Sequence, residues 1–321
     1  MKKKISIVIL TYNNCNETTI PCIDSVLKET PHENLEIIIV DNLSTDETRE
    51  VIKEYEKQNS KIIKAILNDE NYGYAKGNNI GIEIASGDYV ILLNNDTVVT
   101  PNWIDTLLAL FDKDETIGLI GPVSNSVGNE QMLACPDLTI DNFHAFAEEY
   151  VNKRKGNYFF TENLGFFCVA ISRKVIDTIG VLDPNYGIGM FEDTDYCLQA
   201  TKAGFKLAVS EDTFIFHSGS FSFKKLSSEQ YQEIFTENRK YFLSKNEAEW
   251  GISQVSVAFW DKLLQDVNRL KLYYENNNES LPPALEDIMM RTDSQSALLS
   301  ILKVIEDESK ELNYGKILCP E

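Results

Sequence analysis

The sequence predicts an α/β fold built on a mostly parallel sheet, and three observations carry this prediction. Short apolar runs alternate with segments of helical periodicity along the first two thirds of the chain, a pattern typical of parallel sheets. The run 89–93 is apolar throughout, as expected of a strand buried on both faces. Polar residues follow several runs directly, at the strand ends where open α/β sheets bind ligands.

Each element is assigned from its periodicity and its flanking residues. Strands are predicted at 5–10, 35–40, 62–67, 89–93, 117–120, 166–172, 205–209 and 213–216. Helices are predicted at 18–28, 44–58, 75–85, 101–111, 141–153, 173–179 and 192–203. Ser44 or Thr45 is expected to cap the second helix, and the less regular stretch 124–162 is where a mobile loop is expected.

The character of the sequence changes near residue 223. Amphipathic helices are predicted at 226–245, 255–274 and 294–312. We therefore expect one domain over 1–222 and a helical C-terminal extension over 223–321. An apolar stripe within 255–274 predicts either packing on the first domain or pairing in a homodimer. The stripe consists of Val255, Phe259, Leu263, Val267 and Leu270.

Composition excludes several classes of partner. The 321 residues carry a formal net charge of -20, which argues against nucleic acid and against anionic membranes as the main partner. The six cysteines form no C-x-x-C pair and are predicted to be reduced thiols of a cytoplasmic protein. No apolar run approaches the ~20 residues of a membrane span, so no transmembrane segment is expected.

The polar triplet after the strand 89–93 is a candidate metal site. Asn94 and Asp96 are two residues apart, so in extended backbone they project to the same side. Amide and carboxylate oxygens suit Mg²⁺ or Mn²⁺. The alternative is a polar turn after a core strand, because Asn and Asp favour turns.

No glycine-rich phosphate loop follows the first strand. Thr11-Tyr12-Asn13 stands there instead, which counts against a dinucleotide dehydrogenase or a P-loop NTPase. A nucleotide would then be held by side chains at strand ends. Asp41 can accept from a base N–H group, and Tyr12 can lie against a base face.

Three further segments carry candidate residues. In the segment 71–79, Gly73 allows close backbone approach and Lys76 is a candidate phosphate contact, although a glycine turn entering a helix is the alternative. Glu192 or Asp193 is a candidate general base, whereas acids in a first helical turn also complement the helix dipole. His217 is a candidate ligand for the same metal as Asp96, the alternative being a satisfied polar residue at a strand end.

Together these motifs resemble the inverting, family 2 nucleotide-sugar glycosyltransferases of the GT-A fold, over about the first 245 positions. The matching segments are Thr11-Tyr12-Asn13, Val40-Asp41-Asn42, Ser44-Thr45-Asp46, Asn71-x-Gly73-Tyr74-Ala75-x-Gly77-x-Asn79, Gly87-Asp88-Tyr89, Leu93-Asn94-Asn95-Asp96, Phe191-Glu192-Asp193-x-Asp195, His217 and Asn238-Arg239-x-x-Phe242-x-x-Lys245. The triplet Asn-Asn-Asp is similar to that of the rhamnosyl and hexosyl transferases in this family.

The resemblance implies a role for each site residue. Asp96 would bind the metal, with Asn94 in place of the first Asp of the family's Asp-x-Asp motif. Asp193 would be the catalytic base, with Glu192 beside it, and His217 would join Asp96 at the metal. The residues implied at the nucleotide sugar are Thr11, Tyr12, Asn13, Asp41, Asn71, Gly73, Lys76, Asn79, Asn94 and Asn95.

The resemblance also implies an activity. A hexose-type sugar would pass from a nucleotide diphosphate donor, UDP-sugar favoured, to a hydroxyl group with Mn²⁺ or Mg²⁺ as cofactor. The acceptor would be a glycan precursor, a lipid-linked glycan or a protein, and the enzyme would be cytoplasmic or peripheral at the inner membrane face. Three alternatives stay open: a dedicated protein glycosyltransferase, a sugar-nucleotide hydrolase, and a nucleotidyltransferase on a similar sheet.

Overall fold

The computed structural model describes residues 3–31, 33–133, 135, 138–219 and 227–246. The chain divides into two compact units, one of residues 1–127 with 138–247 and the other of residues 128–137 with 248–321. Every helix and strand named below belongs to the first unit. The predicted helices 255–274 and 294–312, with the apolar stripe, lie outside the described residues.

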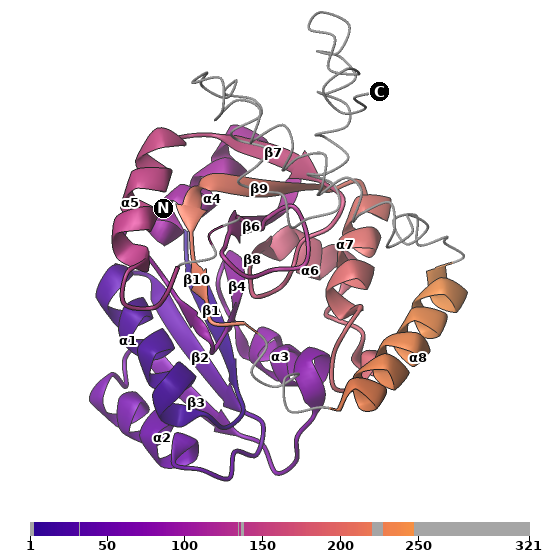
Figure 1. Ribbon diagram of the computed structural model, residues 1–321, viewed down its shortest axis with the longest axis horizontal. Coiled ribbons are helices and arrows are strands. Elements are labelled where there is room, and N and C mark those ends of the chain that lie inside the picture. Colours follow the sequence, from indigo (N-terminus) through magenta and orange to yellow (C-terminus); the bar gives the residue numbers. More distant parts are fainter. Residues whose placement is uncertain (1–2, 32, 134, 136–137, 220–226, 247–321) are drawn as a thin grey trace, which may run out of the picture. The chain divides into compact units, whose positions relative to one another are not determined.

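The first unit is built around a central sheet of eight strands (Figure 1). Its order is β3-β2-β1-β4-β8-β6-β9-β7. These strands are β1 (Ile5–Thr11), β2 (Leu35–Asp41), β3 (Ile63–Leu67), β4 (Tyr89–Asn94), β6 (Ile117–Val123), β7 (Tyr158–Thr161), β8 (Cys168–Ser172) and β9 (Lys206–Phe214). The short strands β5 (Thr97–Val98) and β10 (Phe216–His217) pair with each other, antiparallel, in a second sheet.

The sheet is mixed and mostly parallel, as predicted. Strands β3, β2, β1 and β4 run parallel to one another, and β6 runs parallel to β9. Strand β8 is antiparallel to both β4 and β6, and β7 is antiparallel to β9. The flanking helices are α1 (Ile20–Glu29), α2 (Thr48–Gln58), α3 (Gly73–Ile84), α4 (Trp103–Lys113), α5 (Phe143–Lys153), α6 (Arg173–Ile179), α7 (Glu192–Lys202) and α8 (Ser228–Asn246).

The alternation of side chains along β1 and β2 explains why both faces of the sheet are covered. Ile7 and Ile9 belong to a core cluster that also contains residues of α1, α2 and α4. Val8 points the other way, toward α3, where the absent side chain of Gly81 lets the helix approach. Strands buried on both faces read as continuous apolar runs, which is the pattern seen in the sequence.

Parallel pairing brings the strand ends to one edge. Thr11 at the end of β1 is in register with Asp41 at the end of β2. On its other side, β1 pairs with β4 so that Leu10 is in register with Asn94. The polar residues that follow these strands therefore gather at a single edge of the sheet, as ligand-binding residues do in open α/β sheets.

Two local predictions were wrong. The second helix begins at Thr48 and not at Ser44 or Thr45. The N-cap residue is Glu47, whose side chain makes no capping bond, and Oδ1 of Asp46, one residue earlier, accepts from the Thr48 backbone N–H at 3.1 Å. The hydroxyl of Ser44 instead accepts from the backbone N–H of Asn13 at 2.8 Å.

The predictions for the segment 124–162 and for the last strands also need correction. The helix predicted at 141–153 is present as α5, but strand β7, which pairs with β9, was not predicted within this segment. The two strands predicted at 205–209 and 213–216 are largely one strand, β9. Ser210 and Asp212 lie inside β9, where the Ser210 hydroxyl donates to Asp212 at 2.7 Å.

Two further findings concern the described residues only. The cysteines among them are free thiols, namely Cys15, Cys22, Cys135, Cys168 and Cys197. Within the same residues, no helix is long and apolar enough to cross a membrane.

Candidate active site

Asp96 and His217 meet at the edge of the sheet. The Nε2 atom of His217 lies 3.2 Å from Oδ1 of Asp96, and both side chains are about one tenth exposed. Asp96 directly precedes β5 and His217 ends β10, and these strands pair so that Thr97 is in register with His217. The backbone N–H of Ser218 also donates to the Asp96 carbonyl at 2.9 Å. The pairing of two short strands thus fixes the distance between the two candidate ligands.

Three residues hold His217, two of them at its ring and one at its backbone. Its Nδ1 lies 2.6 Å from the carbonyl oxygen of Ser126. Asn125 donates to the His217 carbonyl at 3.0 Å and accepts from its backbone N–H at 2.8 Å. The ring of Phe167 stacks on the imidazole with centroids 5.3 Å apart. Ser126, Asn125 and Phe167 were not identified in the sequence, where nothing links them to a residue about 50 to 90 positions away.

The contacts of His217 indicate whether its ring and Asp96 could bind a divalent cation together. A carbonyl oxygen only accepts, so Nδ1 carries the proton of the neutral ring and donates to Ser126. Nε2 then presents a lone pair to the Asp96 carboxylate. In the neutral ring this lone pair and the carboxylate oxygen 3.2 Å away are both acceptors that a shared cation would satisfy, whereas a ring protonated at both nitrogens would donate from Nε2 to Asp96. One imidazole nitrogen and one carboxylate oxygen are donors that Mn²⁺ accepts.

The rest of the Asn94-Asn95-Asp96 triplet is arranged differently from the prediction. Strand β4 ends at Asn94, and Asn95 and Asp96 form a turn, so the expectation that Asn94 and Asp96 share one side of an extended strand was wrong. The Asn95 amide donates to the hydroxyls of Thr18 and Thr19 at 3.1 and 2.9 Å. Asn95 therefore ties the turn to the chain entering α1. Among the described residues, no group of three or more His, Cys, Asp or Glu side chains is placed so that it could hold a metal ion by itself.

Glu192 and Asp193 are the first two residues of helix α7. Glu192 is buried, and within the described part of the chain its Oε2 has no hydrogen-bond partner. Burial, with the adjacent Asp193 carboxylate, raises the pKa of Glu192 to about 8. Asp193 is half-buried. Burial raises its pKa too, although hydrogen bonds from Thr194 oppose the shift.

The buried phenol of Tyr74 is affected by the charges of Asp96 and of the Glu192–Asp193 pair. Its hydroxyl donates to the carbonyl oxygen of Phe166. Burial raises the pKa of this phenol well above its usual value, and the charges of Glu192, Asp193 and Asp96 raise it further. Charges interact more strongly in the protein interior than in water, so all three carboxylates act on the buried phenol of Tyr74. Tyr74 lies within the motif 71–79 but was not singled out from the sequence.

The ends of β1 and β2 form a separate polar cluster around Asp41. The Asp41 side chain has no exposed surface, and its Oδ2 lies 3.3 Å from Nη1 of Arg49. The same oxygen accepts from the Ser44 backbone N–H at 3.1 Å, and Thr11 donates to Oδ1 at 3.4 Å. Arg49, on α2, was not identified in the sequence. It supplies a cation beside a carboxylate that would otherwise be buried alone.

Exposed apolar side chains flank this cluster. Tyr12 and Leu43 are 38% and 39% exposed, and Leu43 has a φ of 63°. The backbone N–H of Asn42 donates to the Thr11 carbonyl at 2.9 Å, so these two side chains leave neighbouring strand ends. The Asn13 side chain has a partner within the chain, because its Oδ1 accepts from the Thr45 backbone N–H at 2.7 Å.

The start of α3 packs against the loop before α7. Gly73 has a φ of +73°, and a Cβ there would lie 2.9 Å from the Ile188 Cα and closer still to Gly187. Only glycine fits both the backbone angle and this approach. Asn71 accepts from the Gly73 N–H at 3.0 Å, which forms the turn that begins the helix.

Two other predicted residues of this segment have partners in the protein. The Asn79 amide donates to the Leu182 carbonyl at 2.7 Å, and its oxygen accepts from the Leu182 N–H at 3.0 Å. Asn79 therefore joins α3 to a loop about 100 positions later. Lys76 places its ammonium 3.6 Å from the centre of the Tyr72 ring, and about half of its side chain is exposed.

Two curated proteins are similar to part of this chain. Glycosyltransferase GlyG of Streptococcus pneumoniae serotype 4 is 30% identical over 51% of this chain and 54% of its own length. Glycosyltransferase GlyA of the same organism is 27% identical over 50% of this chain and 21% of its own length. The chain thus spans about half, or less, of the length of these relatives.

Two solved structures share the fold. A crystal structure of GalNAc-T7 with UDP, GalNAc and Mn²⁺ superposes with a TM-score of 0.56 and 22% identity, over 87% of this chain and 55% of that one. Residues 1–349 of S. aureus TarS in complex with UDP give a TM-score of 0.50 and 15% identity, over 94% and 92%. Both likenesses concern the fold alone.

The sequence itself gives the family. A family model described as "Glycosyl transferase family 2" matches residues 6–177. The match contains β1 to β4, the turn with Asp96 and Tyr74 of α3. Because it spans more than half of the 321 residues, the chain belongs to glycosyl transferase family 2.

Proposed function

We propose that this protein is a metal-dependent, inverting glycosyltransferase that moves a hexose-type sugar from a nucleotide diphosphate donor to a hydroxyl group. The observation that carries the proposal is that carboxylates of two residue pairs act on the same buried phenol, that of Tyr74. One is the Asp96–His217 pair, with facing atoms 3.2 Å apart. The other is the Glu192–Asp193 pair, whose charges reach the same phenol. Transfer from a sugar diphosphate requires a cation site for the leaving group and a carboxylate for the acceptor.

Asp96 and His217 are the proposed metal ligands. Mn²⁺ or Mg²⁺ held there supplies Lewis-acid stabilisation of the negative charge on the departing diphosphate. With two ligands from the described residues, the other coordination positions belong to phosphate oxygens and water, as is usual for Mg²⁺ at nucleotide sites. His217 contributes a neutral ring whose orientation Ser126 fixes through Nδ1. The crystal structure of GalNAc-T7 with UDP and Mn²⁺ supports this choice of ion and donor.

The nucleotide is proposed to bind at the ends of β1 and β2. Tyr12 is exposed there and offers its ring as a face for the base. Asp41 is the proposed acceptor for a base N–H group, and because its side chain has no exposed surface, this contact requires the residues that cover it to move. UDP is favoured as the nucleotide, and the complex of TarS with UDP supports it.

Asp193 is the proposed general base. It is half-buried, whereas Glu192 is 7% exposed, so Asp193 is the more accessible to an acceptor hydroxyl. The proton of that hydroxyl passes to the Asp193 carboxylate as its oxygen bonds to the anomeric carbon and the bond to the diphosphate breaks. One displacement by one nucleophile inverts the anomeric centre, and only one carboxylate need act as base.

The acceptor remains the broadest part of the proposal. A glycan precursor, a lipid-linked glycan or a protein side chain each presents a hydroxyl group that this mechanism can use. The cytoplasmic site of action, including a peripheral position at the inner membrane face, stays a prediction. The homodimer also stays a prediction, because the stripe over 255–274 lies outside the described residues.

A nucleotide-sugar panel tests the proposed function. The full chain is heated with UDP-, GDP- and dTDP-sugars in Mn²⁺, because a ligand that binds the native state raises Tm by mass action. We expect one donor to raise Tm and to release nucleoside diphosphate. Product analysis with and without sugar acceptors separates a transferase from a hydrolase, and pyrophosphate release from a nucleoside triphosphate would identify a nucleotidyltransferase. No Tm shift and no diphosphate release with any donor would contradict the proposal.

A further inference from the structure

We propose that helix α8 is a positioning element of the active site, which fastens the chain on both sides of Glu192 and Asp193. The inference rests on the proposed function in one respect, the role of Asp193 as general base. It concerns residues near the end of the described chain, far in sequence from the strand-end motifs. One fastening is made by Asn238 and the other by Lys245 with Asn246.

The turn before α7 needs support from its surroundings. Four of its residues have positive φ, at 63°, 146°, 77° and 75° for Gly187, Gly189, Met190 and Phe191. Met190 and Phe191 are not glycines, and side chains disfavour this region of backbone space. Such conformations persist where the surrounding structure determines them. Phe191 is also the residue before Glu192, and its side chain does not cap the helix.

Asn238 makes the first fastening. Its amide nitrogen lies 2.9 Å from the Tyr186 carbonyl oxygen, 2.8 Å from that of Gly189 and 3.1 Å from that of Met190. One side chain of α8 thus donates to three backbone acceptors of the strained turn.

The aromatic rings of α8 add to this fastening. Phe235 and Phe242 place their ring centroids 5.2 and 5.8 Å from that of Phe191. Phe191 is 6% exposed. Its unusual backbone angle is therefore accompanied by burial of its ring against α8, which is a reason for the angle to persist.

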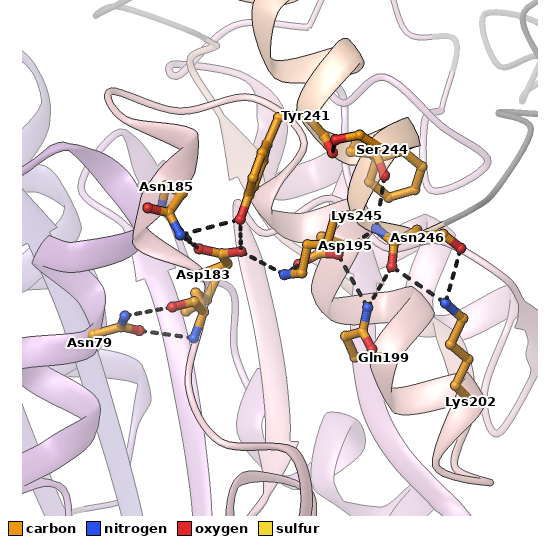
Figure 2. A network of polar contacts seen from close by, with 12 residues as sticks. Asn79, Asp183, Asn185, Asp195, Gln199, Lys202, Tyr241, Ser244, Lys245 and Asn246 are labelled. Atoms are coloured by element: carbon orange, nitrogen blue, oxygen red, sulfur yellow. Dashed lines mark hydrogen bonds and ion pairs between the residues drawn. The ribbon is translucent and has the colours of Figure 1, made fainter.

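Lys245 makes the second fastening, on the first turn of α7 (Figure 2). Its ammonium lies 2.6 Å from Oδ2 of Asp195 and 2.6 Å from Oδ2 of Asp183. Asn246 donates to the other Asp195 oxygen at 2.8 Å. The Tyr241 hydroxyl donates to Asp183 at 2.9 Å, so neighbouring turns of α8 contact the same pair of carboxylates.

These contacts of α8 matter because, within the described residues, no hydrogen bond to Oε2 holds the Glu192 carboxylate in place. In the described residues the buried Oε2 of Glu192 has no hydrogen-bond partner, and Asp193 bonds to the adjacent Thr194. The positions of both carboxylates are therefore set by the backbone at the start of α7. That backbone is held at 186–190 by Asn238 and at residue 195 by Lys245 and Asn246.

Amide hydrogen exchange tests the fastening directly, whatever the reaction is. Asn238→Leu keeps the size of the side chain and removes the donor. We expect amides of 186–195 to exchange at least ten times faster in this variant, with β1 and β2 unchanged. Ser244→Ala is the matched control on α8, since the Ser244 hydroxyl donates within the helix to the Tyr241 carbonyl. It should exchange like wild type. Wild-type exchange of 186–195 in Asn238→Leu would overturn the inference.

Turnover tests the link to catalysis. With the nucleotide sugar that gives the largest Tm shift, Asn238→Leu should lower kcat at least tenfold while the KM for donor changes less than about threefold. UDP binding in Mn²⁺ should persist. Faster exchange with wild-type kcat would overturn the positioning role. A wild-type protein that binds no nucleotide would refute the proposed function, and the exchange measurement would still decide whether α8 holds the turn.

A second pair of variants guards against misfolding. Lys245→Met removes the cation between Asp183 and Asp195, whereas Lys245→Arg keeps a cation with several donors. We expect Lys245→Met to lower kcat in the same way and Lys245→Arg to recover most of it. Equal kcat in Lys245→Met and wild type would count against the second fastening. If Asn238→Leu does not fold, this pair decides the inference.

Discussion

The Nε2 atom of His217 faces Oδ1 of Asp96 across 3.2 Å, while the opposite ring nitrogen donates to Ser126. The arrangement presents two acceptors to the same point. It arises from the antiparallel pairing of β5 with β10, which brings together residues about 120 positions apart in the sequence. With a neutral ring, a divalent cation between them would satisfy both acceptors, and this has direct consequences for binding and turnover.

Asp96→Ala should abolish turnover and metal-dependent donor binding, because it removes the only carboxylate of the Asn94-Asn95-Asp96 triplet. Titration calorimetry of Mn²⁺ and of UDP with Mn²⁺ measures the loss without reference to turnover. Asp112→Asn is the control, an exposed aspartate on α4, and should bind like wild type. Excess EDTA should stop wild-type turnover, and undiminished transfer in EDTA would refute the metal assignment.

Glu192→Gln should stabilise the protein at neutral and mildly alkaline pH. Burial and Asp193 raise the folded pKa of Glu192 to about 8, above an unfolded value of about 4.3. The unfolded state then loses its proton first, so wild-type stability falls as pH rises between these two values. Glutamine has no charge to bury. The Tm of Glu192→Gln should exceed that of wild type at pH 8 and approach it at pH 4. A lower Tm at pH 8 would contradict the burial of this carboxyl.

Lys245→Met should destabilise the protein by about 1–3 kcal/mol, since it leaves two carboxylates without their shared cation and Lys245 is partly exposed. Burial opposes the charge of Lys245, but the hydrogen bonds and charges of Asp183 and Asp195 raise its pKa. The contribution should therefore be present through neutral pH and be lost as pH rises through the raised folded pKa. Urea unfolding at pH 7 measures it. Lys53→Met, at an exposed position of α2, should change stability by less than about 0.5 kcal/mol.

Gly73→Ala should cost more than the strain of its backbone angle alone. At Gly73, φ is +73° and a Cβ would press on Gly187 and Ile188. At Gly204, φ is +90° and a Cβ would meet nothing within 4 Å. Gly204→Ala should therefore lose about 1–2 kcal/mol from strain alone, and Gly73→Ala should lose clearly more. Chemical unfolding of both variants makes the comparison. Equal losses would mean that the loop at Gly187 and Ile188 moves away from the added Cβ at little cost in stability.

The fold was largely predictable because its signals are local. The apolar runs of β1, β2 and β4 and the helical periodicity of α6 lie within single short windows of sequence. Strand β7 was not predicted, because Tyr158–Thr161 is short and becomes a strand by pairing with β9. Ser210 and Asp212 suggested a break in β9, since the sequence does not show that they bond to each other.

The site was predictable only in part, because its geometry depends on long-range contacts. Asp96, His217, Glu192 and Asp193 were identified through their residue types and the family resemblance. Their partners were not: Asn125 and Ser126 meet His217 from about 90 positions away. The extended-strand argument for Asn94 and Asp96 failed because the backbone turns at Asn95. The ties of Asn13 and Asn79 to the backbone likewise depend on residues distant in sequence.

The carboxylate pair at the start of α7 offers the most direct test of the proposed mechanism. Donor turnover is measured by release of nucleoside diphosphate in the presence of acceptor, with donor binding followed by Tm shift. Asp193→Asn keeps the shape and removes the base, so kcat should fall by ~10²-fold or more while donor binding persists. Glu192→Gln should keep more activity than Asp193→Asn. An inactive Glu192→Gln beside an active Asp193→Asn would assign the base to Glu192, and wild-type turnover in both variants would contradict the mechanism itself.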